Sequence, residues 1–189
     1  MSEFNNLVQT ICNPSTPQQS RTAAEQQLLE ILSNIDTWKQ YSECLYTADD
    51  TVCFFVCIGF QKMVWRQWRR IPSEDKILLS QTVVSALTNR KNLQSFAKSK
   101  LEQVLATICV NSCSIEPVLG LLVDARNPAV SVGLSTMRTV LELVLSDDPQ
   151  LYPEYKPTLL SAVTDIVSPL TNLACSACTT AITRAADSS

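Results

Sequence analysis

The side chains best suited to react or to bind a metal ion are eight cysteines, six of which occur in regularly spaced pairs. Those pairs are Cys53/Cys57, Cys109/Cys113 and Cys175/Cys178. A zinc site needs four converging ligands, commonly with helix–loop placement, and a redox Cys-x-x-Cys motif usually follows a strand. The sequence predicts neither context, so we interpret the cysteines as small buried apolar residues. An enzyme with a thiol nucleophile remains the competing hypothesis.

The sequence contains no histidine. This excludes Ser-His-Asp and Cys-His nucleophile systems and His-Glu-x-x-His zinc hydrolysis. The three glycines, Gly59, Gly120 and Gly133, are too far apart to form a phosphate-binding loop. The carboxylates show no pairing suited to acid–base chemistry. We therefore expect no enzymatic activity, no catalytic or metal-binding residues and no cofactor.

A basic cluster lies near the end of a strongly apolar segment. Lys62, Arg66, Arg69 and Arg70 follow the spacing i, i+4, i+7 and i+8, which places them on one face of a predicted helix without Asp or Glu. Two interpretations remain open. The plainer one is a solvated helix end, since cations are favourable at a helix C-terminus. The functional one is an electrostatic patch for an acidic protein surface.

A second polar stripe occurs in a later segment, where Gln94, Lys98 and Glu102 are spaced i, i+4 and i+8 opposite the apolar residues. We expect these side chains to be exposed, either as a solvated face or as a contact for a partner. Trp65 and Trp68 lie among apolar neighbours. They are therefore predicted to anchor the core rather than to stack on a ligand.

Composition predicts an all-α fold. Charged residues make up 17% of the 189 residues, against about 25% in an average protein, as expected for helices buried on two sides. None of the three glycines forms an Asn-Gly or Asp-Gly hairpin turn. A net charge of −3 argues against nucleic acid as the main partner. With neither a signal peptide nor an apolar run of about 20 residues, we expect no membrane partner, a nuclear and cytoplasmic location, and reduced cysteines.

Apolar spacing divides the chain into alternating short and long helices. The expected helices span residues 4–11, 16–33, 35–45, 50–70, 73–87, 92–109, 115–125, 128–144 and 157–170. Thr16, in a capping box with Gln19, and Ser73 are the predicted N-caps, and Ile71-Pro72 should end the fourth helix. That helix is apolar almost all round between residues 52 and 60, which predicts burial on both sides.

Pairing these helices gives a repeat of about 40 residues, within the range of HEAT repeats. A tetratricopeptide array would repeat at about 34 residues with a Trp, Gly and Tyr pattern that this sequence lacks. We therefore predict an all-α fold in which residues 1–189 form an α-solenoid of about four and a half HEAT-like antiparallel helix pairs. The segment is expected to belong to a longer solenoid.

The order of several motifs resembles the N-terminal region of the importin-β superfamily of nuclear transport receptors, above all its exportin branch. The motifs are Arg21-x-x-Ala24-Glu25-x-x-Leu28-Leu29, Trp38, Phe60-x-x-x-Val64-x-x-x-Trp68, Ile71-Pro72-Ser73-x-Asp75-Lys76 and Phe96-x-x-x-Lys100-Leu101-x-x-Val104-Leu105. The chain is most similar to exportins that carry actin–profilin complexes, over about residues 1–145. It departs from them in having Cys113-Ser-Ile-Glu-Pro117 where a Trp-Pro is common, and the chains of the family are several times longer.

This resemblance implies a nuclear export receptor whose N-terminal repeats bind the Ran GTPase in its GTP form through the second helix of each pair. In this chain the second helices are residues 16–33, 50–70 and 92–109. The candidate contact residues on them are Lys62, Arg66, Arg69, Gln94, Lys98 and Glu102. Protein cargo such as actin–profilin, and nucleoporins for the full-length receptor, are the other implied partners. A HEAT-type scaffold or regulatory subunit unrelated to transport is the alternative.

Overall fold

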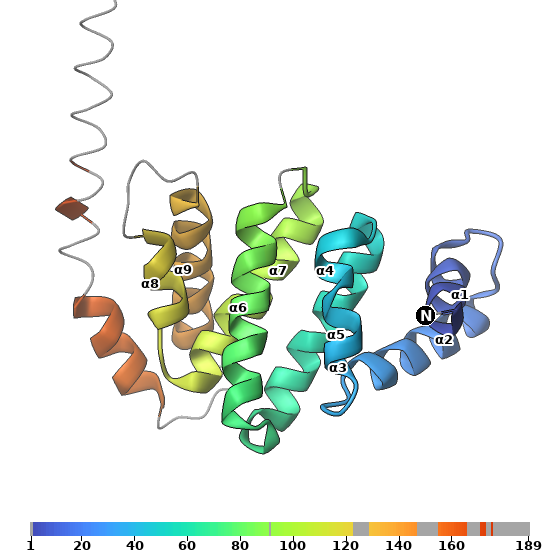
Figure 1. The fold of residues 1–189 in the computed structure, drawn as a ribbon, viewed down its shortest axis with the longest axis horizontal. Helices are drawn as coiled ribbons and strands as arrows, with labels where there is room; N and C mark the ends of the chain where they lie inside the picture. Colours follow the sequence, from blue (N-terminus) through green and yellow to red (C-terminus); the bar gives the residue numbers. More distant parts are fainter. Residues whose placement is uncertain are drawn as a thin grey trace, which may run out of the picture. The chain divides into compact units, whose positions relative to one another are not determined.

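The computed structural model describes residues 2–90, 92–122, 129–146, 155–165, 171–172 and 175 (Figure 1). Within these ranges the regular structure is helical and contains no strand, which confirms the predicted all-α class. The chain divides into two compact units, Met1–Thr107 and Ile108–Ser189. The predicted helix start at Asn127-Pro128, the end of the last predicted helix and Cys178 lie outside the described residues.

The described residues of the first unit contain seven α-helical segments and one turn of 3-10 helix. They are α1 (Ser2–Cys12), α2 (Gln18–Leu32), α3 (Trp38–Ser42), α4 (Cys44–Thr47), α5 (Asp50–Gln67), η1 (Trp68–Arg70), α6 (Ser73–Asn89) and the first part of α7 (Ser95–Ser112). α1 packs on α2, and α2 and α4 both pack on α5 (Figure 1). Trp38 is buried with its ring edge-on to Phe60, 5.9 Å between centroids. α5 is therefore the central helix of this unit.

α2 and α5 approach each other closely at Gly59. A Cβ atom placed on Gly59 would lie 2.2 Å from the Cβ atom of Leu32. Farther along the same pair, the Gln67 side-chain amide donates a hydrogen bond of 2.8 Å to the Ser33 carbonyl at the end of α2. A glycine is thus required in the middle of α5 by the neighbouring backbone, although glycine disfavours a helix.

The predicted helix over residues 35–45 is wrong in its extent, because the structure has two short helices there. The Asn34 side-chain oxygen accepts the Asp36 N–H at 2.9 Å, and the Asn34 carbonyl accepts the Thr37 N–H at 3.3 Å. This Asx turn holds Ile35 outside the helix and delays the helix start to Trp38. A break at Glu43 then separates α3 from α4.

The helix caps also differ from the sequence prediction. The Pro17 and Pro72 carbonyls accept the first helical hydrogen bonds, from the N–H groups of Arg21 and Lys76. The prolines are therefore the N-caps of α2 and α6, and neither the predicted Thr16 capping box nor a Ser73 side-chain cap forms. Fixed at φ −55° and −56° with an extended ψ, each proline already has the backbone shape of a cap.

The start of α5 has a side-chain cap that was not predicted from the sequence. The Asp49 carboxylate accepts the N–H groups of Thr51 at 2.8 Å and Val52 at 2.9 Å. It satisfies two N–H groups that have no partner within the helix, and it suits the positive end of the helix dipole. At the other end, Ile71 takes an extended conformation before Pro72, so the predicted stop at Ile71-Pro72 is confirmed.

The second unit contains the end of α7, α8 (Glu116–Leu122), α9 (Val130–Leu145) and a further helical segment over residues 155–165. α8 packs against α9 (Figure 1). α7 ends at Ser112, and the next residue, Cys113, has a φ of 54° in the left-handed region. The Ser114 N–H then reaches the Cys109 carbonyl at 3.0 Å, which closes the last turn as glycine does in many helices.

Candidate partner-binding surface

α5 has two faces of different burial. Its buried side chains pack inside the first unit: Val52, Cys53, Val56, Cys57, Phe60, Met63 and Val64. The opposite face includes six residues, apolar or basic, that are half-buried or exposed: Phe54, Phe55, Ile58, Lys62, Trp65 and Arg66. We call these six residues the α5 stripe. The predicted burial of residues 52–60 on both sides is therefore wrong for Phe54, Phe55 and Ile58.

The predicted basic patch is only partly brought together. Lys62 is half-buried and Arg66 is exposed, and both lie on the α5 stripe. Arg69 is exposed as well, but it belongs to η1. A 3-10 helix has three residues per turn, so Arg69 and Arg70 leave the angular register that an α-helix would have given them. The single face predicted for all four cations is therefore wrong.

The second predicted stripe is not a uniformly exposed face. Gln94 is exposed just before α7 and Lys98 is half-buried, but Glu102 is buried, with 7% of its surface exposed. The prediction of an exposed polar face is wrong for Glu102. α7 uses Phe96 and Lys100 to contact α5, and residues two positions away on a helix face another direction. The side chains of Lys98 and Glu102 thus lie on a side of α7 that does not face the α5 stripe.

α5 and α7 are joined by a ring contact and by a chain of polar side chains. The rings of Phe54 and Phe96 meet edge to face with centroids 5.6 Å apart. Lys100 donates a 2.6 Å hydrogen bond to the side-chain Oε1 of Gln61, and the side-chain Nε2 of Gln61 donates to the Thr107 hydroxyl at 3.2 Å. Burial lowers the pKa of Lys100 from 10.5, and the nearby Cys57 opposes that shift. These contacts fix Phe96, 41% exposed, beside the α5 stripe.

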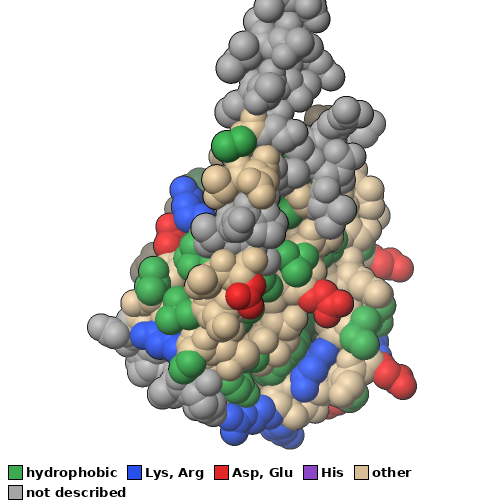
Figure 2. Space-filling model, turned by 90° about the vertical axis from the view of Figure 1, so that its left-hand side faces the viewer, with side chains coloured by type: hydrophobic (Ala, Val, Ile, Leu, Met, Phe, Trp, Pro, Cys, Tyr) green, Lys and Arg blue, Asp and Glu red, His purple; other side chains and the backbone are tan. Residues whose placement is uncertain are grey.

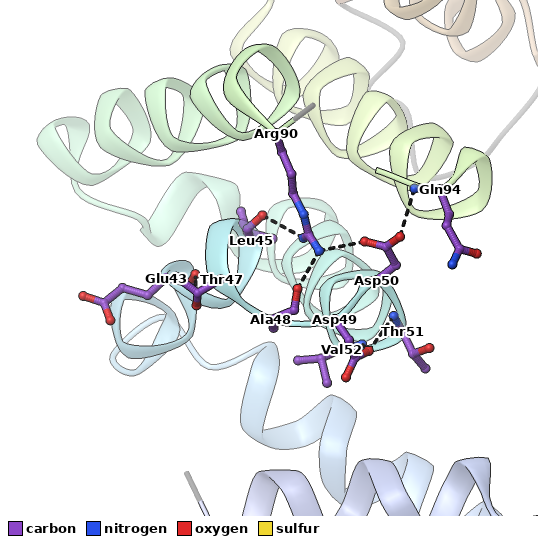
Figure 3. A network of polar contacts seen from close by, with 10 residues as sticks. All are labelled: Glu43, Leu45, Thr47, Ala48, Asp49, Asp50, Thr51, Val52, Arg90 and Gln94. Atoms are coloured by element: carbon purple, nitrogen blue, oxygen red, sulfur yellow. Dashed lines mark hydrogen bonds and ion pairs between the residues drawn. The ribbon is translucent and has the colours of Figure 1, made fainter. Parts of the chain in front are cut away.

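A second polar network fixes the start of α5 (Figure 3). Arg90, which follows the last residue of α6, donates to the carbonyls of Leu45 and Ala48 and pairs with the Asp50 carboxylate at 2.7 Å. The other Asp50 oxygen accepts the Gln94 N–H at 2.9 Å. The network joins the turn before α5 to the turn between α6 and α7. The sequence gives no local sign of it beyond an arginine at a helix end and an aspartate at a helix start.

The two tryptophans have different environments. Trp68 is buried, and the Lys76 ammonium lies 5.2 Å from its ring centroid. The prediction of a core anchor is confirmed for Trp68. Trp65 is only half-buried and belongs to the α5 stripe, so that prediction is wrong for Trp65.

The predicted burial of the paired cysteines is confirmed for three of them. Cys53, Cys57 and Cys109 are buried, whereas Cys113 is half-buried and Cys175 is exposed. A hydrogen bond from Cys57 lowers the pKa of Cys53, but Cys53 has no exposed surface from which to attack a substrate. Burial raises the pKa of Cys57 well above its ordinary value and that of Cys109 to about 12. Among the described residues, His, Cys, Asp and Glu nowhere gather in threes that could hold a metal ion.

Acidic side chains outnumber basic ones in this chain, 18 to 15. The chain has a net charge of −3. The described side chains on the face drawn in Figure 2 include both acidic and basic groups, interspersed with hydrophobic ones. None of the helices in the described ranges combines the length and the apolar character that crossing a bilayer requires.

Comparisons with protein-family models, curated proteins and solved structures found no match to this chain.

Proposed function

We propose that this chain is the Ran-binding N-terminal segment of a nuclear export receptor, which moves protein cargo such as actin–profilin from the nucleus to the cytoplasm in the presence of Ran-GTP. In this proposal the chain is a HEAT-like solenoid and a non-catalytic binding protein. It needs no cofactor, and nucleoporins are partners of the full-length receptor. Two observations support the proposal. One is the motif order, and the other is that first helices contact first helices, and second helices contact second helices, in successive pairs.

The second helices of successive pairs stack on one another in the first unit. α2 contacts α5 where Leu32 meets Gly59, and α5 contacts α7 where Phe54 meets Phe96. In a solenoid, each pair buries its face on the next pair in this consecutive order. α2, α5 and α7 are also the helices that the resemblance assigns to Ran binding.

The first helices stack in the same order. The Lys39 ammonium on α3 lies 2.6 Å from the Asp75 carboxylate on α6. The Tyr46 hydroxyl on α4 donates a 2.8 Å hydrogen bond to the Thr82 carbonyl on α6. This like-on-like stacking of first and second helices is the observation that best supports a solenoid, and through it a transport receptor.

The direct test is a pull-down of Ran with the immobilised 189-residue chain. We expect recovery of Ran loaded with a non-hydrolysable GTP analogue and much weaker recovery of Ran loaded with GDP. An unrelated small GTPase in both nucleotide states is the specificity control. Failure to recover Ran in either state, from a chain that melts cooperatively, would favour the alternative of a HEAT-type scaffold unrelated to transport.

A further inference from the structure

The α5 stripe is a partly exposed helix face that carries three aromatic rings and one aliphatic side chain. Phe54, Ile58 and Trp65 follow one another at helical spacing, and Phe55 lies beside them. We propose that this face, extended by Phe96, is a docking surface for a short segment of a partner protein that carries both hydrophobic and acidic side chains.

The rings form a connected surface. Phe54 contacts Phe55 with centroids 5.9 Å apart and contacts Phe96 with centroids 5.6 Å apart. Both contacts are edge-to-face, which is a preferred geometry for aromatic pairs. Phe96 is 41% exposed, so the cluster presents apolar surface although its members support each other. Aromatic side chains of this kind dominate the binding energy of many protein interfaces.

The position of the rings is fixed by the fold. Gly59 brings α2 against one side of α5, and the Lys100–Gln61 hydrogen bond holds α7 on the side of Phe54. Lys100 also donates to Gln103 at 3.1 Å, which orients the lysine within α7. A surface held in place by its neighbours loses little conformational freedom when a partner binds.

The charges on α5 determine the chemistry of the partner. Its cations, Lys62 and Arg66, both lie on the stripe, one and two turns from Ile58. The acidic residue within α5 is Asp50, which lies at the start of the helix, away from these cations, and pairs with Arg90. The exposed face is therefore apolar with a basic end, and it complements a segment in which carboxylates flank hydrophobic side chains.

Single-stranded nucleic acid is the rival ligand, since it also combines negative charge with flat apolar faces. The observations favour a protein segment for two reasons. The stripe contains the aliphatic Ile58 between its rings, and it carries only Lys62 and Arg66 as cations, in a chain with a net charge of −3. Nucleic-acid binding relies on a larger basic field.

Three fluorescein-labelled peptides and the complete 189-residue chain test this proposal by fluorescence anisotropy. One peptide is amphipathic and built from Glu, Asp, Leu and Phe. The second has Lys in place of each acid, and the third has Ser in place of each Leu and Phe. We expect the first peptide to bind at least tenfold more tightly than either of the others.

A charge-reversed chain, Lys62→Glu with Arg66→Glu, should prefer the lysine peptide to the acidic one. The matched control is Arg138→Glu on α9, whose guanidinium is exposed and pairs with Glu142 on the same helix. It should bind all three peptides as the unaltered chain does. If the double variant does not fold, Arg66→Glu alone is the second test, because Arg66 is exposed and its expected effect has the same direction.

Equal binding of the three peptides would overturn the proposal, because the affinity would then depend on neither the charge nor the hydrophobic side chains of the peptide. An unchanged preference in a folded charge-reversed chain would also overturn it, as would tighter binding of a single-stranded oligothymidine than of the acidic peptide. The inference names a further ligand for a face that also carries two of the candidate Ran contacts, Lys62 and Arg66. Because the peptide assay contains no Ran, its failure and a failure to bind Ran are separate results.

Discussion

The Arg90 guanidinium and the Asp50 carboxylate lie 2.7 Å apart and join two turns that are 40 residues apart in the sequence. Both side chains are mostly buried, with 16% and 13% of their surfaces exposed. Arg90 also donates to two backbone carbonyls, and Asp50 accepts a backbone N–H. Removal of either side chain therefore leaves several polar groups without their partners, not a single broken ion pair.

Replacement of Arg90 by Met should lower the free energy of unfolding by about 2–4 kcal/mol, because it leaves the Asp50 carboxylate mostly buried without its cation. Urea unfolding measures the change. The matched control is Arg138→Met, which removes an exposed i,i+4 pair at 3.5 Å and should cost about 0.5 kcal/mol or less. Equal effects of the two substitutions would contradict a structural role for the Arg90 network.

Gly59→Ala should destabilise the chain by about 2 kcal/mol or more, because the new Cβ atom would lie 2.2 Å from Leu32 Cβ and force α2 and α5 apart. Gly120→Ala on α8 is the control. A Cβ atom there meets nothing within 4 Å, so the better helix propensity of alanine should stabilise by about 0.5–1 kcal/mol. Thermal melting of both variants distinguishes a packing effect from propensity. A stabilised Gly59→Ala chain would rule out the close approach of the two helices.

The buried Cys109 thiol should weaken the fold at alkaline pH. Burial raises its pKa from 9.0 to about 12, so above pH 9.0 the folded chain retains a proton that the unfolded chain loses. This stabilising contribution is complete below pH 9.0 and is lost as the pH rises toward 12, by up to about 1.4 kcal/mol per pH unit. In Cys109→Ala the free energy of unfolding should fall less steeply between about pH 8 and pH 10.5.

Lys100 acts in the opposite direction over part of that range, because its pKa is lowered in the folded chain and stability then rises with pH. Its contribution is present in both the unaltered chain and Cys109→Ala. The difference between the two unfolding curves, each measured by urea titration with a reductant present, isolates the thiol. Parallel pH dependences of the two proteins would show that Cys109 does not ionise on unfolding.

Local sequence patterns predicted the features that depend on local chemistry. The absence of hairpin turns predicted an all-helical chain, and the conformational restriction before Pro72 predicted the end of the helix at Ile71. Apolar spacing also identified the buried residues Leu28, Val83 and Leu105 as members of the core. Each of these depends on residues only a few positions apart.

Features that depend on distant neighbours were not predicted. Phe54 and Phe55 look like core residues in the sequence, and only the positions of the adjacent helices show that this side of α5 is incompletely buried. Glu102 looks like a surface residue because it continues a polar stripe, yet it is buried. The Arg90–Asp50 pair spans 40 residues, a separation that hydrophobic periodicity cannot detect.

We propose that this chain binds Ran and that its affinity depends on the nucleotide that Ran carries. The most direct measurement is the equilibrium affinity of the 189-residue chain for Ran carrying a non-hydrolysable GTP analogue and for Ran carrying GDP, by calorimetric titration. We predict at least tenfold tighter binding of the GTP form, about 1.4 kcal/mol, and a weaker interaction for Lys62→Glu with Arg66→Glu than for Arg138→Glu. Equal affinity for the two nucleotide forms, or no binding of either by the folded chain, would contradict a function as a Ran-dependent receptor.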